Sequence, residues 1–553
     1  MSEKYVIGLD YGTLSGRGVL VRVSDGEILN SFVYNYPHAV MDEILCETGE
    51  KLPENWALQV PHDYVEVLDN VVPRLMAESG VERSDVIAIG VDFTSCTMLP
   101  VDENNVPLCE LDEYKTCKYA YAKLWKHHGA QPEADVINAL LEARGLEEDP
   151  RFGGKVSSEL MVPKAMETLL DAPEIYEAAD EFVEAGDWLT RVLTDSNDRS
   201  CSMAGYKMWW NALEGYPDAD FFKALDPRLE NFTSEKLPGK LRGMGERIGV
   251  LSKVWADRLC LAEGIAVAPA IIDSHAGFPG SGVSRPDQMM MVLGTSSVML
   301  ALTDQPYSRY GVMGGVRDAI VPGWYALESG LACVGDLFGW YMENMLPASY
   351  EKQAQAEGKD VFTYLNEKAS ARKVGEGGVL ALDWFSGNKT PFVDGSLSGA
   401  LVGMNMTTRP EDIYRAMIEA TAFGTKRIVD LYEAHGANIA EVIASGGIAI
   451  KNPFVMQIYA DVLGKDISVT ACDQAAALGS AIYATLAAGS ANGGYDDYTE
   501  AVQKMSQPML TTYHPVEENT ARYAKLYKLY CALGGKMGDD VDEIMHELRK
   551  ICD

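Results

Sequence analysis

The sequence predicts a two-domain α/β fold whose halves face each other across a cleft, and three observations lead to this prediction. Residues 6–13, Val-Ile-Gly-Leu-Asp-Tyr-Gly-Thr, form an apolar run that ends in an acid, a glycine and a hydroxyl. This pattern is typical of a strand that enters a tight polar turn. Residues 289–300 repeat the design in the second half of the chain, and residues 442–447 form an apolar run ending in paired glycines. One strand–turn–strand unit in each half indicates a duplicated domain.

The first turn has the chemistry of a phosphate site. Gly12 can adopt backbone angles closed to other residues, so we expect the turn to fold tightly against a bulky anion. Thr13 adds a hydroxyl and a backbone N–H, and successive N–H donors form an anion nest. Asp10 repels phosphate and suits this place only through a divalent cation such as Mg2+, which keeps part of its water shell. A hairpin with an ordinary Asp-x-Gly turn is the alternative interpretation.

The turn within residues 289–300 and the glycines that end residues 442–447 extend this prediction from a phosphate to a whole nucleotide. Each half would offer a Gly-Thr turn to the same polyphosphate. Paired glycines let a flat ring such as adenine lie against bare backbone, and the Asn-Pro pair that follows opens a helix; a plain strand–helix turn is the alternative. The residues of these two places are Gly294, Thr295, Ser296, Gly446, Gly447 and Asn452.

Size and charge exclude several classes of function. At 553 residues the chain exceeds one compact core, and 47% hydrophobic with 23% charged residues is the composition of a folded protein. The net charge of −34 repels nucleic acid and anionic membranes, and no run of Lys and Arg offers a local exception. We therefore expect a protein that binds neither nucleic acid nor membrane.

The cysteines and the start of the chain indicate a cytoplasmic protein. Ten cysteines without a Cys-x-x-Cys pair or zinc-like spacing fit a reducing compartment. The first strand begins too early for a signal peptide, and no apolar stretch approaches the roughly 20 residues that span a bilayer.

The other elements follow from periodicity. Thr408 and Glu411 predict a capping box with Pro410 in the first turn of a core helix, and the chain from Lys504 onward is expected to be helical. We place the domain boundary between residues 270 and 271, which gives an N-terminal domain of 1–270 and a C-terminal domain of 271–553. The other expected elements are strands at 28–36, 85–92 and 467–470, a helix from Pro61, a mostly helical region at 112–264 and a small-residue helix at 475–488.

Polar residues at strand ends are candidates for a ligand site. Thr94 and Ser95 follow a buried strand, where open α/β sheets place ligands, although a satisfied turn is the alternative. Lys207 lies among aromatic residues, where a charged amine is costly unless it meets a partner. The alternative is a lysine whose stem covers aromatic faces while its head stays in water.

Two acids end strands in the second half of the chain. Asp273 follows an apolar strand and is succeeded by small residues, which places a carboxylate at the edge of a cleft; the neighbouring His275 is more typical of a structural residue. Glu328 either orients ligand hydroxyls or caps a helix expected from about Leu331.

With its motifs in this order, the sequence resembles the actin-like ATPase fold, which is related to ribonuclease H. Residues 399–404, then 412–413 and 416–419, are similar to the pattern of the FGGY carbohydrate kinases. Residues 91–97, 124–128, 186–190, 205–211 and 272–277 resemble members that act on ribulose. The resemblance runs from residue 6 to about residue 489, and the last sixty or so residues carry no motif that we can place.

This resemblance implies a kinase that moves the γ-phosphate of ATP to a sugar, with L-ribulose as the acceptor, L-ribulose 5-phosphate as the product and arabinose breakdown as the context. The triphosphate would lie on the two Gly-Thr turns, with adenine near the paired glycines. Asp10 would hold Mg2+ through water, with Asp273 nearby as a further metal contact and as the catalytic base, ionised at its ordinary pKa of about 3.9. The sugar would be bound by Thr94, Ser95, Cys96, Lys207, Asp273 and Glu328.

Two alternatives stay open. A kinase for xylulose, glycerol or another polyol is one, because the motifs specify phosphate transfer better than the sugar. An actin- or chaperone-like ATPase is the other, but the sequence has no sign of a peptide-binding or polymer-forming region. The sequence also lacks a P-loop, a Gly-x-Ser-x-Gly elbow and a His-Glu-x-x-His helix. It does not reveal the oligomeric state, so a homodimer stays open.

Overall fold

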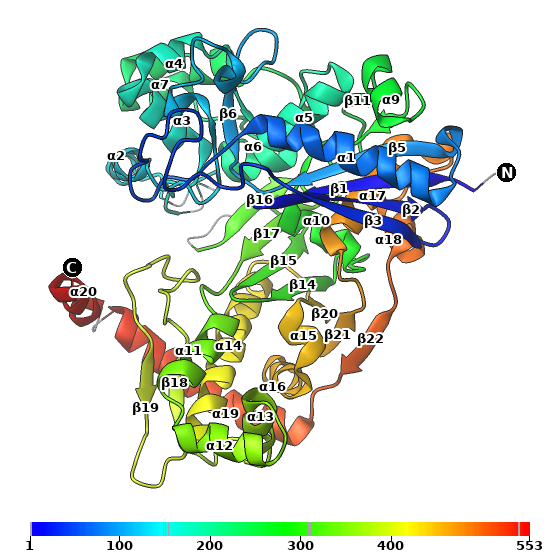
Figure 1. Cartoon of the computed structure of the whole chain (residues 1–553). Coiled ribbons are helices and arrows are strands. Elements are labelled where there is room, and N and C mark those ends of the chain that lie inside the picture. The colour runs from blue at the N-terminus through cyan, green and yellow to red at the C-terminus, as the bar shows by residue number, and fades with distance from the viewer. Residues whose placement is uncertain are drawn as a thin grey trace.

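The computed structural model describes residues 3–147, 149, 151–152, 154–306, 311–539 and 542–552. Two large mixed sheets, each with helices packed on it, form two domains that lie one above the other in Figure 1. Buried apolar side chains form two cores, of which the first contains the first sheet and also side chains of the second sheet such as Met290 and Leu300. The predicted two-domain α/β fold is confirmed.

The first sheet has the strand order β11–β12–β5–β1–β2–β3, and β13 also pairs with β5. The hairpin β1–β2 is antiparallel, and β5 lies parallel to β1 on its other side. The strands are β1 Tyr5–Tyr11, β2 Ser15–Arg22, β3 Ile28–Asn35, β5 Val86–Phe93, β11 Gly249–Val250, β12 Ala266–Val267 and β13 Ile271–Ile272.

The second sheet has the order β16–β17–β15–β14–β20–β21–β22. The hairpin β14–β15 is antiparallel and β20 lies parallel to β14, so both sheets repeat one design, as the duplicated turns predicted. The strands are β14 Gln288–Leu293, β15 Ser297–Thr303, β16 Met313–Arg317, β17 Tyr325–Ser329, β20 Glu441–Ser445, β21 Asp466–Thr470 and β22 Met509–Tyr513.

Helices and smaller sheets surround these two sheets. No described helix is long and apolar enough to cross a membrane. The helices before residue 270 are α1 Pro61–Ser79, α2 Gln131–Arg144, α3 Met161–Asp171, α4 Pro173–Ala178, α5 Ala185–Thr194, α6 Cys201–Lys207, α7 Ala219–Leu225, α8 Phe232–Lys236 and α9 Lys253–Leu259. The later helices are α10 Asp273–Gly280, α11 Gly335–Asn344, α12 Ala348–Ala356, α13 Val361–Ser370, α14 Pro410–Glu433, α15 Gly447–Lys451, α16 Pro453–Leu463, α17 Ala475–Ala488, α18 Tyr498–Met505, α19 Glu517–Asp539 and α20 Asp542–Cys552. The smaller strands are β4 Leu58–Gln59, β6 Met98–Val101, β7 Ala122–Lys123, β8 Glu181–Glu184, β9 Arg199–Ser200, β10 Leu241–Arg242, β18 Leu380–Leu382 and β19 Ala400–Val402.

The predictions for the start of α14 and for the chain after Lys504 were wrong. The capping box of α14 lies one residue later than expected, because the Asp412 carboxylate accepts the backbone N–H of Arg409 at 3.0 Å, while the Thr408 hydroxyl oxygen accepts the N–H of Asn405. The region from Lys504 onward is not all helical, since β22 pairs antiparallel with β21. The side chains of this edge strand are mostly exposed, so no apolar alternation marks it.

Helix α17 comes late in the chain but packs on the first sheet, beside β1 (Figure 1). The contact is so close that a Cβ atom on Gly8 or Gly90 would lie 1.9 Å from a carbonyl oxygen of α17. The predicted tight packing of this small-residue helix is confirmed. Helix α17 follows the predicted boundary in sequence but packs on the first sheet, and the division of the chain at residues 270 and 271 remains a prediction.

Candidate functional site

A cavity of about 310 Å3 lies between the two domains and brings together two residues that were predicted from distant parts of the sequence. Lys207, at the end of α6, lines it from the first domain, and Glu328, on β17, lines it from the second. Lys155 and Glu159 also border the cavity, as does Lys389 from a loop of the second domain. The cavity therefore offers several ammonium donors and carboxylate acceptors to a polar ligand.

Lys207 is a buried cation with 9% of its surface exposed, so its head does not stay in water as the alternative interpretation requires. Burial opposes its charge, but the Cys96 sulfur and the carboxylates of Glu328 and Glu159 outweigh burial and raise the pKa of Lys207. Its ammonium donates no hydrogen bond within the described part of the chain. A ligand oxygen in the cavity would satisfy it.

Glu328 is held by His275, whose Nε2 lies 2.6 Å from its carboxylate. Burial opposes ionisation, but the hydrogen bond and charge of His275, together with Lys207, lower the pKa of Glu328 to about 2. Helix α11 begins only at Gly335, so Glu328 does not cap it, and the expected helix start at Leu331 was wrong. His275 is fully buried, and its hydrogen bond holds the Glu328 carboxylate in place.

Asp273 is the first residue of α10, and its carboxylate accepts the N–H of Ser274 at 2.6 Å. Burial and then the charge of Asp10 raise the pKa of Asp273 to about 7, although Lys207 opposes this shift. The expectation of an ordinary pKa near 3.9 was therefore wrong. A general base works best when its pKa lies near the operating pH, so the shift suits this role.

Asp10, near the end of β1, lies beside Asp92 on β5 and 3.1 Å from Nε of Arg17. Burial raises the pKa of Asp10 against the attraction of Arg17. Among the described residues no group of three or more His, Cys, Asp or Glu side chains has metal-ligand geometry. The carboxylates of Asp10 and Asp273 are of the donor type that Mg2+ prefers, and they would hold the ion together with water and phosphate oxygens.

A buried lysine, Lys164, holds the loop that follows β5 through hydrogen bonds to backbone carbonyls. Lys164 donates to the carbonyl oxygens of Cys96 at 2.7 Å and Leu124 at 2.8 Å, and Cys96 has a left-handed backbone with φ of 56°. The Thr94 hydroxyl shares a 2.9 Å hydrogen bond with Thr97, as the satisfied-turn alternative predicted, while Ser95 is half-buried. Burial raises the pKa of the Cys96 thiol to about 12.

In each Gly-Thr turn the glycine N–H donates to a backbone carbonyl within the turn, three residues further on in the first turn and two residues further on in the second. The N–H of Gly12 donates to the carbonyl of Ser15 at 3.0 Å, and that of Gly294 donates to the carbonyl of Ser296 at 2.9 Å. Neither glycine has a positive φ, so the expected use of special backbone angles at Gly12 was wrong. A Cβ atom at either glycine would meet no atom closer than 3.4 Å, so the missing side chain leaves open space for a ligand.

The N–H groups of Thr13, Thr295 and Ser296 point to no acceptor in the part of the chain that the structure describes. Such donors are what an anion nest requires. The Thr13 hydroxyl oxygen accepts the indole N–H of Trp125 at 3.1 Å, which ties the first turn to the segment around Leu124.

The paired glycines have different roles. Gly446 has a φ of 93°, and a Cβ atom there would lie 2.4 Å from the carbonyl oxygen of Leu293, so the backbone itself requires glycine. Gly447 begins α15, and a Cβ atom there would have no neighbouring atom within 4 Å, so its backbone faces open space. Asn452 caps α16 by accepting the N–H of Val455 at 3.2 Å.

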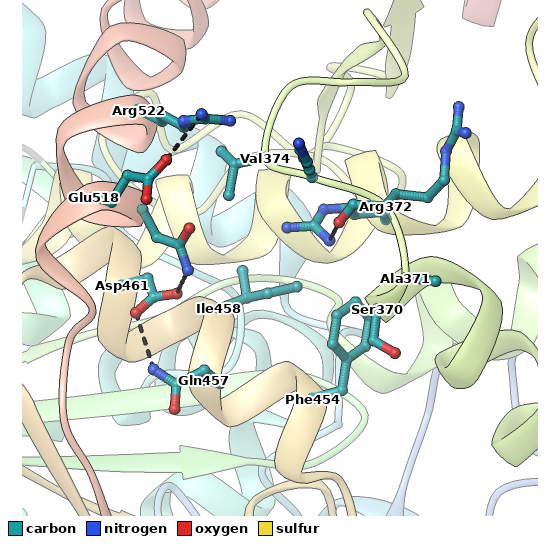
Figure 2. Close-up of a pocket in the computed structure, with 13 residues that line it drawn as sticks. Ser370, Ala371, Arg372, Val374, Phe454, Gln457, Ile458, Asp461, Glu518 and Arg522 are labelled. Carbon is teal, nitrogen blue, oxygen red and sulfur yellow. Dashed lines mark hydrogen bonds and ion pairs between the residues drawn. The ribbon is translucent and has the colours of Figure 1, made fainter.

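A larger cavity of about 580 Å3 lies within the second domain, among α13, α14, α16 and α19 (Figure 2). Several of its polar side chains pair with one another: Asp461 accepts from Gln457 and Asn519, and Arg522 pairs with Glu518 at 2.9 Å. None of the predicted site residues borders it. The interdomain cavity is therefore the better candidate site.

Sequence reasoning missed Lys164 and Lys389. Lys164 lies in an apolar helical stretch, and a lysine in such a stretch is a sign that its ammonium is buried and needs acceptors. The acceptors are 40 and 68 residues away in sequence, so the local pattern does not identify them. Lys389 lies in an Asn-Lys-Thr-Pro turn that carries no sign of a neighbour such as Glu328.

Comparison with known proteins agrees with this geometry. The N-terminal domain of the FGGY family of carbohydrate kinases matches residues 5–280, and its C-terminal domain matches residues 289–488. Ribulokinase of Halalkalibacterium halodurans is 46% identical over 551 residues, covering 100% of this chain and 98% of the relative. Ribulokinase of Geobacillus thermodenitrificans is 45% identical and covers 99% and 97%. Among solved structures, xylulose kinase of Rhodospirillum rubrum has a TM-score of 0.79 at 20% identity, covering 97% of this chain and 99% of that one.

Proposed function

Because the chain belongs to the FGGY family of carbohydrate kinases, we propose that it transfers the γ-phosphate of ATP to L-ribulose and forms L-ribulose 5-phosphate in the cytoplasm. The observation that supports this most is the interdomain cavity, where Lys207 and Glu328 meet from separate domains and the charge of each acts on Asp273. A ligand held by both residues bridges the domains.

In this proposal the two Gly-Thr turns bind the triphosphate through free N–H groups, and adenine lies on the backbone at Gly447. Mg2+, when bound, would neutralise phosphate charge beside Asp10 and Asp273. Lys207 donates hydrogen bonds to sugar oxygens, and the ionised Glu328 accepts them from sugar hydroxyls. Positioning and charge neutralisation are what phosphoryl transfer mainly requires of a protein.

Asp273 takes the proton of the attacking hydroxyl in this scheme. The new O–P bond forms as the bond from the γ-phosphorus to the β,γ-bridging oxygen breaks, and ADP leaves with that oxygen. Closure of the domains around the sugar would exclude water, which could otherwise accept the phosphate.

A coupled assay of ADP formation with a panel of L-ribulose, D-ribulose, D- and L-xylulose, glycerol and no acceptor tests this proposal. The highest kcat/KM is expected for L-ribulose, with little ADP formed without sugar. Preference for another polyol would contradict the substrate assignment, and equal turnover without any sugar would favour an ATPase.

A further inference from the structure

We propose that Lys389 binds hydroxyl oxygens of the sugar acceptor from the C-terminal domain, and that helix α20 holds its loop in place. This inference rests on the proposed sugar kinase function. It also assigns a role to part of the C-terminal region, where the sequence shows no motif.

Lys389 lines the same 310 Å3 cavity as Lys207, but the two lysines come from different domains. Glu328 lines this cavity too, and the charge of Lys389 is among those that lower the pKa of Glu328. The side chain of Lys389 is exposed and forms no hydrogen bond or ion pair within the described ranges of the chain. Its three N–H donors are available to a ligand.

The backbone around Lys389 is held firmly although its side chain is free. Asn388 and Asp394 exchange two backbone hydrogen bonds of 2.8 Å, and the Asn388 side chain accepts the N–H of Phe392. The Thr390 hydroxyl donates to the carbonyl oxygen of Gly311 at 2.8 Å, and Gly311 itself lines the cavity. The loop therefore presents Lys389 from a fixed base.

Helix α20, at the C-terminus in Figure 1, lies against this loop. His546 Nε2 lies 2.8 Å from the Asp394 carboxylate, and the sulfur of the buried Met545 accepts the N–H of Ser398. Asp394 is the residue whose backbone pairs with Asn388, next to Lys389. Helix α20 therefore contacts the residue that pairs with Asn388, and the next residue, Lys389, lines the cavity.

The chemistry of the cavity suits a polyol. A ketose offers adjacent hydroxyl and carbonyl oxygens, which accept hydrogen bonds from ammonium groups, while its hydroxyls donate to a carboxylate. Lys207, Lys389 and Glu328 line the same cavity and supply both kinds of partner. Because the lysines belong to different domains, a sugar that reaches both favours the closed arrangement.

The test compares Lys389→Ala and Lys389→Arg with the parent protein, with Lys373→Ala as the matched control. Lys373 is also an exposed loop lysine of the second domain, but it borders the larger cavity and does not line the interdomain one. Steady-state kinetics and calorimetric titration of L-ribulose give KM and Kd separately from turnover. Lys389→Ala should raise both values for the sugar about tenfold or more, as expected for a lost hydrogen bond to a charged donor. Lys389→Arg should restore part of the loss, and the KM for ATP and the Tm should not change.

Unchanged sugar KM and Kd in Lys389→Ala, with normal turnover by the parent, would overturn this inference alone. A rise in the KM for ATP instead of the sugar would overturn it as well. If the parent neither binds nor phosphorylates any polyol, the proposed function fails and the inference with it. His546→Ala tests the support by α20: it should raise the sugar KM by a smaller factor than Lys389→Ala, and an unchanged value would remove α20 from the proposal.

Discussion

At the scale of single residues, burial sets the charge of each group at the interdomain cavity. Glu328 stays ionised because His275 outweighs the cost of its burial, whereas Asp273 has no comparable cation and its pKa rises to about 7. The carboxylate of Glu328 therefore stays charged, whereas that of Asp273 can take up a proton near neutral pH. This difference supports the assignment of Asp273 as the base.

The substitution Asp273→Asn keeps the shape of the side chain and removes its basicity. Single-turnover phosphate transfer should fall by about 10²–10⁴-fold, the usual contribution of a general base, while sugar and ATP binding change much less. Asp257→Asn, at an exposed residue of α9, is the control. Transfer within about threefold of the parent rate would remove Asp273 from the base role.

The substitution Gly294→Val tests the second phosphate turn. A Cβ atom at Gly294 meets only the carbonyl oxygen of Ser296, at 3.8 Å, so the fold should tolerate the change. The added methyl groups would occupy the space assigned to phosphate and should raise the KM for ATP about tenfold or more, or abolish turnover, judged from the cost of displaced phosphate contacts. Circular dichroism checks folding, and normal ATP binding by calorimetry would refute the assignment of this turn.

At the scale of elements, a buried ionic cluster supports the loops around the site. Glu167 on α3 accepts hydrogen bonds from Lys123 on β7 at 2.5 Å and from His127 at 3.0 Å. The segment between these partners includes Trp125, which holds the Thr13 hydroxyl. The cluster thus connects α3 to the first phosphate turn.

The substitution Glu167→Gln leaves Lys123 buried without its carboxylate, so we expect a loss of about 3–5 kcal/mol in the free energy of unfolding at pH 7. Burial alone would raise the pKa of Glu167, but Lys123 and His127 lower it from 4.5 to about 2. A lowered carboxylate pKa stabilises the folded state above the unfolded pKa, and this contribution is lost as pH falls from about 4.5 towards 2.

Urea unfolding midpoints of the parent and Glu167→Gln measure this effect, from pH 7.5 down to the lowest pH at which the parent is folded. The gap between the two proteins should be constant above about pH 5 and narrow below about pH 4.5. A gap that is absent at pH 7.5, or that widens on acidification, would contradict this account of the cluster.

At the scale of the whole molecule, the crossing of α10 and α17 joins the two domains. A Cβ atom on Gly479 would lie 1.7 Å from the carbonyl oxygen of Ala276, and one on Gly280 would lie 1.8 Å from that of Ala475. The two helices therefore touch backbone to backbone. The first residue of α10 is Asp273, so this crossing also positions the proposed base.

The substitution Gly479→Ala should lower the free energy of unfolding by about 3 kcal/mol, because backbone atoms must move to admit the methyl group. Gly535→Ala is the control, since Gly535 lies in α19 with no atom within 4 Å of its Cβ position, and should be neutral or slightly stabilising. Urea unfolding compares the two variants. Equal free energies of unfolding for the two variants would show that α10 and α17 can move apart at their contact without loss of stability.

The sequence by itself determined the elements that depend on local pattern. The hairpins at both Gly-Thr turns, strand β5, which ends at Phe93, and the helix that begins after Asn452 are formed by neighbouring residues, so periodicity and turn chemistry predict them. The family pattern also identified Lys207, Asp273 and Glu328 as candidates. Their roles in the site remain predictions.

The tertiary structure decided the properties that depend on distant neighbours. The pKa of Asp273 follows from burial and from Asp10, more than 250 residues away in the chain. Lys389 became a candidate only when folding placed its loop beside Glu328. Edge strand β22 and the contacts of α20 also have no local signal. Charge states and pockets are set by what surrounds a residue in space, which a local sequence pattern does not contain.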